Sequence, residues 1–459
     1  MPALSDDPTS NSPSQPPPSR ELNGDEPRRG SLLVIFLTVF VDLLGFGMVL
    51  PLLPVYGEHF AHELGYSDVV VGAIVGGLLS SFSLMQFLFV PIWGRLSDRY
   101  GRRPILIAGL IGSTVFYTLF GVATAMGSLL GLFLSRIGAG IAGATIATAQ
   151  AYIADTTTKE KRNKGMALIG AAFALGFTLG PSLGGVSLLF GEGNLELSPW
   201  PGYVAGGFSG IALLMAIFWL PESLRPGSES TSHKLFDTGA LRSALATPSV
   251  GLLLLTAFIA VLSFANFEST LSRQVGQLVD QQPEAVQSLL TWAEARGYHQ
   301  PGEQRLIVIL VVFVYLGVVL TLAQGFLVRR LAGKVSESRL AMAGAVLAVI
   351  GFGLLGVAAH NFSFPLLLVA MAIEVTGFAL VNPSLQSLIS RRSDPALQGG
   401  VLGLSQSSAS LARIIGPLFG NLLFPFWIAL PYVAAAVMMV IALFCMARAA
   451  TSGQDFDAA

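Results

Sequence analysis

The stretch that decides the fold is Gly94-Arg95-Leu96-Ser97-Asp98-Arg99-Tyr100-Gly101-Arg102-Arg103. It lies between two apolar runs, Val69 to Ile92 and Pro104 to Thr124, and each run is long enough to cross a bilayer as a helix. Because arginine crosses hydrocarbon only at a high free-energy cost, the arginines of this turn place it on the cytoplasmic face. Two glycines allow a sharp turn, and the aspartate can accept hydrogen bonds from an arginine or a helix N-terminus. A plain cytoplasmic loop would explain the arginines but not the Gly-x-x-x-Asp-x-x-Gly frame around them.

Composition agrees with a membrane protein. Of the 459 residues, 53% are hydrophobic and only 12% are charged, whereas a soluble domain carries about 25% charged residues. The net charge of −1 argues against a nucleic-acid partner. The one cysteine, Cys445, lies in an apolar run, which excludes a disulfide framework and a cysteine-based metal site. The sequence contains no phosphate-binding loop, so we expect no ATP-driven step.

Apolar runs of about 18 to 28 residues recur along the chain and predict an all-α polytopic membrane protein with twelve transmembrane helices. The predicted spans are 32–56, 69–92, 104–124, 128–154, 165–189, 203–220, 249–271, 305–328, 338–358, 363–389, 398–423 and 425–447. The polar linker at 223–248 divides them into two six-helix bundles, 31–222 and 249–450. Residues 1–30 are predicted to be a disordered cytoplasmic tail, and 451–459 a short C-terminal tail.

The distribution of basic residues sets the orientation. Of the 26 Lys and Arg residues, 21 fall on the face that carries the 94–103 turn, three on the other face and two within spans. Both termini and the linker are therefore predicted to be cytoplasmic. We expect a multi-pass protein of the plasma (inner) membrane.

The two halves of the chain resemble each other. Gly180-Pro181 recurs 236 residues later as Gly416-Pro417. The same shift moves the 94–103 turn onto the loop that contains Arg329-Arg330-Leu331-Ala332-Gly333-Lys334, a degenerate copy without the aspartate. A pseudo-twofold pair of bundles predicts a solute site between them near the bilayer midplane. Residues 272–304 are an outer insertion, in which the amphipathic segment 283–298 predicts a short surface helix.

Charged residues within the predicted spans are the first candidates for function, because such residues are costly in lipid and usually face a partner or an aqueous cavity. In the first half, Asp42 is expected to face Arg136, which small residues follow at a spacing that permits close helix packing. The alternative is an ion pair that only fixes the geometry of the bundle.

In the second half the candidates are Glu268, Glu374 and Arg413. Burial raises the pKa of a carboxyl group and a nearby arginine lowers it, so a carboxyl between these states can load and release a proton. We expect Glu374 to pair with Arg413 and to carry the proton. Glu268 is expected toward the outer end of its helix, where it could also be an interfacial carboxylate that reaches water.

Three further sets of residues complete the sequence-level candidates. In the fifth span, a proline and several glycines predict a kink and close packing at Gly176, Gly180, Pro181, Gly184 and Gly185. Uncharged polar side chains either line the solute cavity or join helices, and these are Gln86, Gln150, Asn266, Gln324, Asn382, Gln386 and Gln406. A zinc site at His59 and His62 is disfavoured, because nothing in the sequence completes its ligand set.

Several motifs resemble those of a known family. The turn at 94–103 resembles the G-x-L-x-D-R-x-G-R-[RK] loop between helices 2 and 3 of the major facilitator superfamily, which assigns a gating motif to Gly94, Asp98, Arg99, Gly101, Arg102 and Arg103. The spacings around Asp42 and Arg136 and the G-x-x-x-G-P-x-x-G-G pattern from Gly176 are similar to drug–proton antiporters. Residues 151–155 and 221–223 resemble the tetracycline-resistance branch, and 267–271 resemble tetracycline-transporter-like animal proteins.

This resemblance implies a secondary transporter, not an enzyme, that works by alternating access as a monomer and without a cofactor. Its expected partners are a small organic solute, protons and the lipid bilayer, and its expected activity is proton-coupled export. One alternative is an uptake symporter or uniporter for a sugar or an organic anion on the same fold. A second is a receptor or scaffold that no longer transports. The long insertion and the degenerate second loop leave the solute open.

Overall fold

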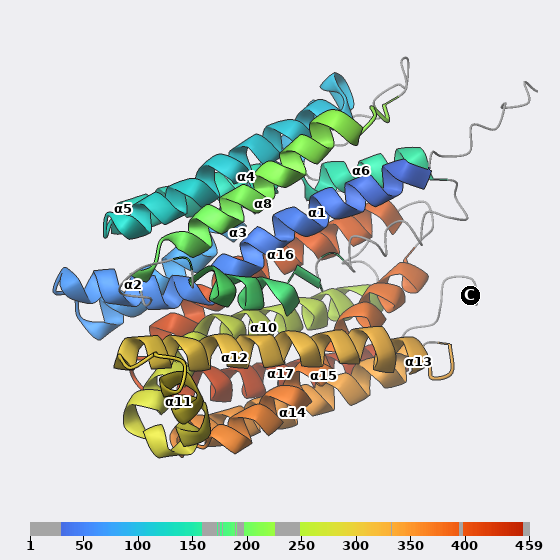
Figure 1. The fold of residues 1–459 in the computed structure, drawn as a ribbon. Helices are drawn as coiled ribbons and strands as arrows, with labels where there is room; N and C mark the ends of the chain where they lie inside the picture. Colours follow the sequence, from blue (N-terminus) through green and yellow to red (C-terminus); the bar gives the residue numbers. More distant parts are fainter. Residues whose placement is uncertain are drawn as a thin grey trace, which may run out of the picture.

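The computed structural model describes residues 29–157, 172, 175–176, 178–188, 190, 197–224, 248–331, 333–393 and 398–452. Regular structure in these segments is helical throughout. The long helices run roughly along one direction, with the N-terminal helices grouped on one side and the C-terminal helices on the other (Figure 1). The predicted linker 223–248 falls almost wholly outside the described residues, as do both predicted tails.

The N-terminal half begins with a helix in two pieces. Pro51 separates them, since proline cannot supply the backbone N–H that a continuous helix needs. A second interruption, at Ala144 and Thr145, divides the predicted fourth span. The helices are α1 (Arg29–Val49), α2 (Leu52–Glu63), α3 (Asp68–Tyr100), α4 (Arg102–Ala125), α5 (Leu129–Gly143), α6 (Ile146–Thr156) and α8 (Trp200–Trp219).

The C-terminal half repeats the pattern of long helices joined by short turns. One span is modified near its C-terminal end, where α12 passes into a π-helical segment, η3, and then into α13. The elements are α10 (Pro248–Gln281), η2 (Pro283–Val286), α11 (Gln287–Glu294), α12 (Pro301–Leu322), η3 (Ala323–Val328), α13 (Arg329–Leu331), α14 (Glu337–His360), α15 (Phe364–Arg392), α16 (Gln398–Leu423) and α17 (Leu430–Ser452).

Ten spans in the described residues are long and apolar enough to cross a membrane. The two other predicted spans correspond to α16, whose serines and Arg413 lower its hydropathy, and to a helical segment at 178–188 within the partly described fifth span. The predicted outer insertion is shorter than expected, because α10 continues to Gln281. The amphipathic segment that follows it forms η2 and α11.

Small residues let the helices of each half approach closely. A Cβ atom on Gly180 would lie 2.6 Å from the Cα of Gly47, so the fifth span presses directly on α1. In the second half, a Cβ atom on Gly344 would lie 2.7 Å from the carbonyl oxygen of Gly377, which joins α14 to α15 in the same way. Glycine is therefore required at these crossings for packing rather than for backbone freedom.

The two halves meet along α3 and α16. A Cβ atom on Gly76 would lie 2.9 Å from the Cα of Leu418, and the hydroxyl of Ser80 donates to the carbonyl oxygen of Ile414 at 2.6 Å. A second junction joins the fifth span to α12, where the hydroxyl of Thr178 donates to the carbonyl oxygen of Gly317 at 3.0 Å. In the predicted orientation, these contacts occupy the middle and the outer half of the bilayer.

Candidate transport site

In the N-terminal half, Asp42 on α1 is directed toward hydroxyl groups of the neighbouring helices. Ser209 on α8 donates to its Oδ1 atom at 3.3 Å, and Ser113 on α4 also interacts with the carboxyl group. No sequence pattern selects these serines, because their orientation toward Asp42 is set only when α4 and α8 pack against α1. The arrangement is a carboxyl group supported by neutral donors.

Arg136 on α5 does not form the expected ion pair with Asp42 among the described residues. Its side chain is 2% exposed, and its guanidinium lies over the rings of Phe82 at 4.6 Å and Phe46 at 5.7 Å. Its Nε atom has no hydrogen-bond partner in the part of the chain that the structure describes. Aromatic faces attract a cation through the ring quadrupole, so they supply the stabilisation that the sequence had assigned to the carboxylate.

In the C-terminal half, Glu374 on α15 is 1% exposed. Its surroundings are apolar and include Phe352, Phe378 and Met439, and no described residue forms a hydrogen bond with its Oε2 atom. Across the helix crossing, a Cβ atom on Gly351 would lie 2.6 Å from the backbone nitrogen of Glu374. Glu374 is thus deeply buried, as expected, and no arginine or lysine among the described residues forms an ion pair with it.

Arg413 on α16 interacts electrostatically with Glu268 on α10, and Glu268 in turn interacts with Glu374. Among the described residues, Arg413 thus interacts with Glu268 rather than with Glu374, and Glu374 is the third ionisable group in this region. Glu268 also lies deeper than expected, because its helix extends thirteen residues beyond it to Gln281. Its Oε1 atom is buried and has no hydrogen-bond partner among the described residues.

The gating motif folds back onto the N-terminal half. Arg102 binds Asp98 and lies 3.1 Å from Asp155 at the end of α6, and its backbone N–H donates to Glu222 at 2.9 Å. Gly101 has φ of +105°, which a residue with a side chain rarely adopts, and a Cβ atom there would collide with Glu222. The sequence marked Asp155 and Glu222 only as parts of similar motifs, and the fold brings both to the loop. Arg99 stacks on neighbouring Tyr100 at 5.3 Å.

The glycines of the fifth span lie against α1 and α12. Cβ atoms on Gly176 and Gly184 would lie 3.0 Å from Leu43 and 2.9 Å from Met48, whereas one on Gly185 would lie 3.2 Å from Leu310 in the other half. Pro181 lies within the helical segment. The glycine motif therefore forms the surface of the fifth span that packs against α1 on one side and α12 on the other.

The uncharged polar candidates separate into two groups. Gln86 donates to the carbonyl oxygen of Gly143 at 3.2 Å, Asn266 to that of Pro431 at 2.8 Å, and Gln386 to the hydroxyl of Ser405 at 3.3 Å. These three join helices, and Asn266 is fully buried. The remaining candidates keep at least partial exposure, and they are Gln150, Gln324, Asn382 and Gln406.

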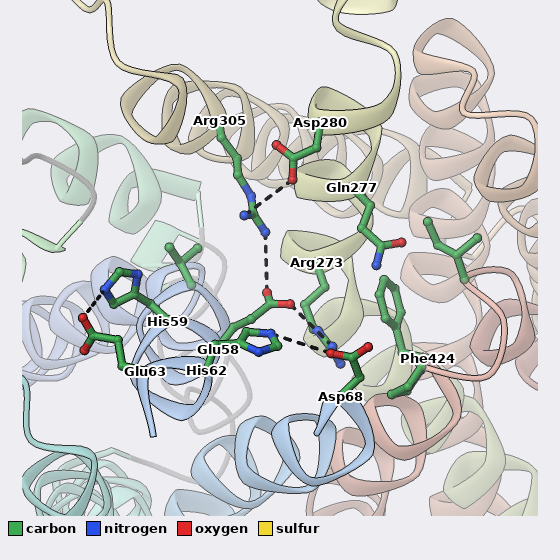
Figure 2. Close-up of a pocket in the computed structure, with 13 residues that line it drawn as sticks. Glu58, His59, His62, Glu63, Asp68, Arg273, Gln277, Asp280, Arg305 and Phe424 are labelled. Atoms are coloured by element: carbon green, nitrogen blue, oxygen red, sulfur yellow. Dashed lines mark ion pairs between the residues drawn. The ribbon is translucent and has the colours of Figure 1, made fainter. Parts of the chain in front are cut away.

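At the outer end of the protein, a cavity of about 780 Å³ opens between α2, α10, α12 and the end of α16. His59 lies 3.3 Å from Glu63, and His62 lies 3.9 Å from Asp68, so each imidazole is directed toward a carboxylate (Figure 2). In the sequence, His59 and His62 are candidates only for a zinc site. Across the described residues, no group of three metal-ligating side chains is present.

Comparison with known proteins fits this architecture. The family model described as Major Facilitator Superfamily matches residues 35–417. The chain belongs to this superfamily. Members of this superfamily are transporters rather than enzymes, which supports a general transport function for this membrane protein.

Among curated superfamily proteins, the chain is 30% identical over 432 residues to the tetracycline resistance protein, class C, of Escherichia coli, covering 92% of this chain and 98% of that protein. It is also 30% identical over 447 residues to human major facilitator superfamily domain-containing protein 10, covering 87% of this chain and 89% of the relative. These similarities place the chain among tetracycline-transporter-like superfamily members.

Solved structures of the superfamily share the fold. The crystal structure of the human organic anion transporter MFSD10 (TETRAN) aligns with a TM-score of 0.63 and 27% identity, over 91% of this chain and 99% of that one. The D-xylose-proton symporter aligns with a TM-score of 0.69 over 91% of this chain and 96% of the other, at only 17% identity. The second likeness shows the fold alone.

Proposed function

We propose that this superfamily transporter exports small organic solutes in exchange for protons. The observation that carries the proposal is the buried Glu374 carboxyl group, whose surroundings are apolar and whose Oε2 atom has no hydrogen-bond partner among the described residues, together with Glu268 and Arg413 near it. Two carboxyl groups and one guanidinium balance electrically when one carboxyl holds a proton, and unbalanced charge is costly in a buried setting. Glu268 interacts with the arginine, which leaves Glu374 as the group that holds the proton.

Coupling requires that the proton affinity of this group differ between the two conformations of the transporter. Arg413 lies on α16, the helix that also packs against α3 of the other half. Movement of one half against the other therefore changes the surroundings of the arginine, and through it the balance of the two carboxyl groups. This link between the interface and the charged group supports coupling of proton binding to alternating access.

Arg136 is the residue of the N-terminal half that we expect to bind the solute. A buried guanidinium held by two aromatic rings, with an Nε atom that lacks a partner, offers both a donor and a stacking surface to a planar anionic or zwitterionic solute. The relatives' names suggest two solutes to test first, namely tetracycline and an organic anion. We propose that such a solute binds between Arg136 and the C-terminal charged group.

The proposal extends to the setting of the protein. We propose that it acts as a monomer in the plasma (inner) membrane, with both termini and the linker in the cytoplasm, as the distribution of basic residues predicts. The described contacts between the halves, from the membrane middle outward, support a conformation that is closed on the outer side.

Proteoliposomes test the direction and the coupling. Purified protein is reconstituted, candidate solutes are selected by thermal shift, and flux of a stabilising solute is measured with the lumen acidified relative to the bath. An exchanger should accumulate the solute in the acidic lumen. Depletion from that lumen would instead support an uptake symporter, equilibration without accumulation would support a uniporter, and absence of flux under every gradient would support a receptor or scaffold.

A further inference from the structure

The outer cavity contains an ion-pair network that joins the two halves of the protein. Glu58 on α2 belongs to the N-terminal half, whereas Arg273 on α10 and Arg305 on α12 belong to the C-terminal half. Both arginines extend toward the Glu58 carboxylate, which lies between them (Figure 2). The Nη2 atom of Arg273 lies 3.6 Å from Oε1, and the Nη2 atom of Arg305 lies 3.5 Å from Oε2.

Each arginine also has a second partner within its own half. Arg305 lies 3.6 Å from Asp280 on α10, while Arg273 donates to Asn421 at 3.4 Å and stacks on Phe424 at 4.5 Å. If the halves separate on this side, both arginines keep these partners and Glu58 enters the water of the cavity. The contacts made by Glu58 are therefore the part of the network that opening breaks.

Because these ion pairs are partly buried, they are expected to stabilise the junction more than ion pairs on the open surface do. The side chain of Arg273 is 4% exposed, that of Glu58 19% and that of Arg305 22%. Pairs that are shielded from water are screened less by salt than exposed ones. Nearby, Ser272 donates to the carbonyl oxygen of Pro51 at 3.0 Å, so a second contact between the halves supports the same junction.

We propose that Glu58 is an outer latch, which binds Arg273 and Arg305 across the interface and stabilises the outward-closed conformation. Asp280 competes with Glu58 for Arg305 and thereby weakens the latch. The inference rests on the proposed alternating access, because it assigns the latch to one of two conformations. It concerns the outer side and is independent of the gating motif at 94–103.

Distances between spin labels on the outer side test the latch. The sole cysteine is removed by Cys445→Ser, and labels are placed at exposed Leu64 in the N-terminal half and Ser288 in the C-terminal half. Glu58→Gln should raise the ratio of the long-distance to the short-distance population on the order of tenfold. Asp280→Asn should lower this ratio or leave it unchanged, since Arg305 then has only the latch.

The matched control is Glu63→Gln, which removes another carboxylate from α2. Among the described residues, that carboxylate contacts His59 and no residue of the other half. The control should leave the distance distribution unchanged. If Glu58→Gln does not fold, Arg305→Gln replaces it and should act in the same direction. If two distance populations are present but their ratio changes equally in Glu58→Gln and Glu63→Gln, or changes in neither variant, the latch is overturned while alternating access stands. A single distance in every variant would overturn both.

Discussion

The substitution Glu374→Gln separates proton coupling from solute movement. Glutamine has nearly the shape of protonated glutamate and remains neutral in both conformations, so it should leave the group permanently in its proton-loaded charge state. The cost to folding is modest, because the new amide introduces a donor into apolar surroundings beside Phe352 and Phe378. An unsatisfied donor of this kind costs about 1–3 kcal/mol. The variant should fold, with a lower melting temperature.

The expected effect on transport is much larger than the effect on stability. A gradient of one pH unit supplies about 1.4 kcal/mol per proton, which for one-to-one exchange corresponds to about tenfold accumulation. Because Glu374 carries no releasable proton in the variant, the accumulation ratio should fall to about one. Exchange of labelled for unlabelled solute requires no net proton movement and should remain measurable.

Paired assays in proteoliposomes measure both quantities on the same preparation. Gradient-driven accumulation and solute exchange are followed for the wild type, for Glu374→Gln and for Glu284→Gln, a control that alters an exposed carboxylate in η2. The control should behave like the wild type in both assays. Full accumulation by Glu374→Gln would refute the assignment and move the proton to Asp42.

Three further substitutions test other parts of the site. Asp42→Asn should lower the melting temperature or the solute affinity, since the amide keeps only one of the two oxygens that can accept from Ser209 and Ser113, and a lost hydrogen bond costs about 0.5–1.5 kcal/mol; unchanged melting and binding would exclude this role. We expect Asp98 to reach the cytoplasmic end of α16 in the outward-open conformation, so Asp98→Asn should shift the population toward the inward-open conformation by about 1–3 kcal/mol. Unchanged cysteine accessibility along the cytoplasmic part of α16 would contradict that. Gly180→Val should destabilise the fold by about 1–3 kcal/mol or more through its contact with α1. Its control is Gly207→Val, where a Cβ atom meets nothing within 4 Å; equal loss of folded protein in both variants would refute the packing argument.

The packing of whole helices could be anticipated better than the pairing of single side chains. The glycines at 176, 180 and 184 were selected by their spacing, and they lie where that spacing puts them, along one face against α1. Spacing defines a helix face, but it does not define which neighbour a long side chain reaches. Arg136 was therefore found deep in its helix, as expected, while its contacts proved to be Phe82 and Phe46 rather than Asp42.

Helix ends were the main source of error in placing charged groups. Glu268 was expected near the outer surface because polar residues begin soon after it, yet α10 continues to Gln281. Residues such as Arg273 tolerate a helical position there because Glu58 and Phe424 surround the guanidinium. The polar residues after Glu268 therefore continue α10 to Gln281 instead of forming a loop, because contacts with other helices stabilise them there.

The sequence by itself determined the membrane class, the two related halves and the family, since these depend on hydropathy and short local motifs, and its charge distribution predicts the orientation. Only the tertiary structure decided which charges interact, because partners such as Glu58 and Arg305 lie far apart in the chain and on different bundles. It also decided that Arg413 interacts with Glu268, with Glu374 beyond it. Electrostatic partners are selected by the rotation and depth of each helix, and those are set by packing between helices.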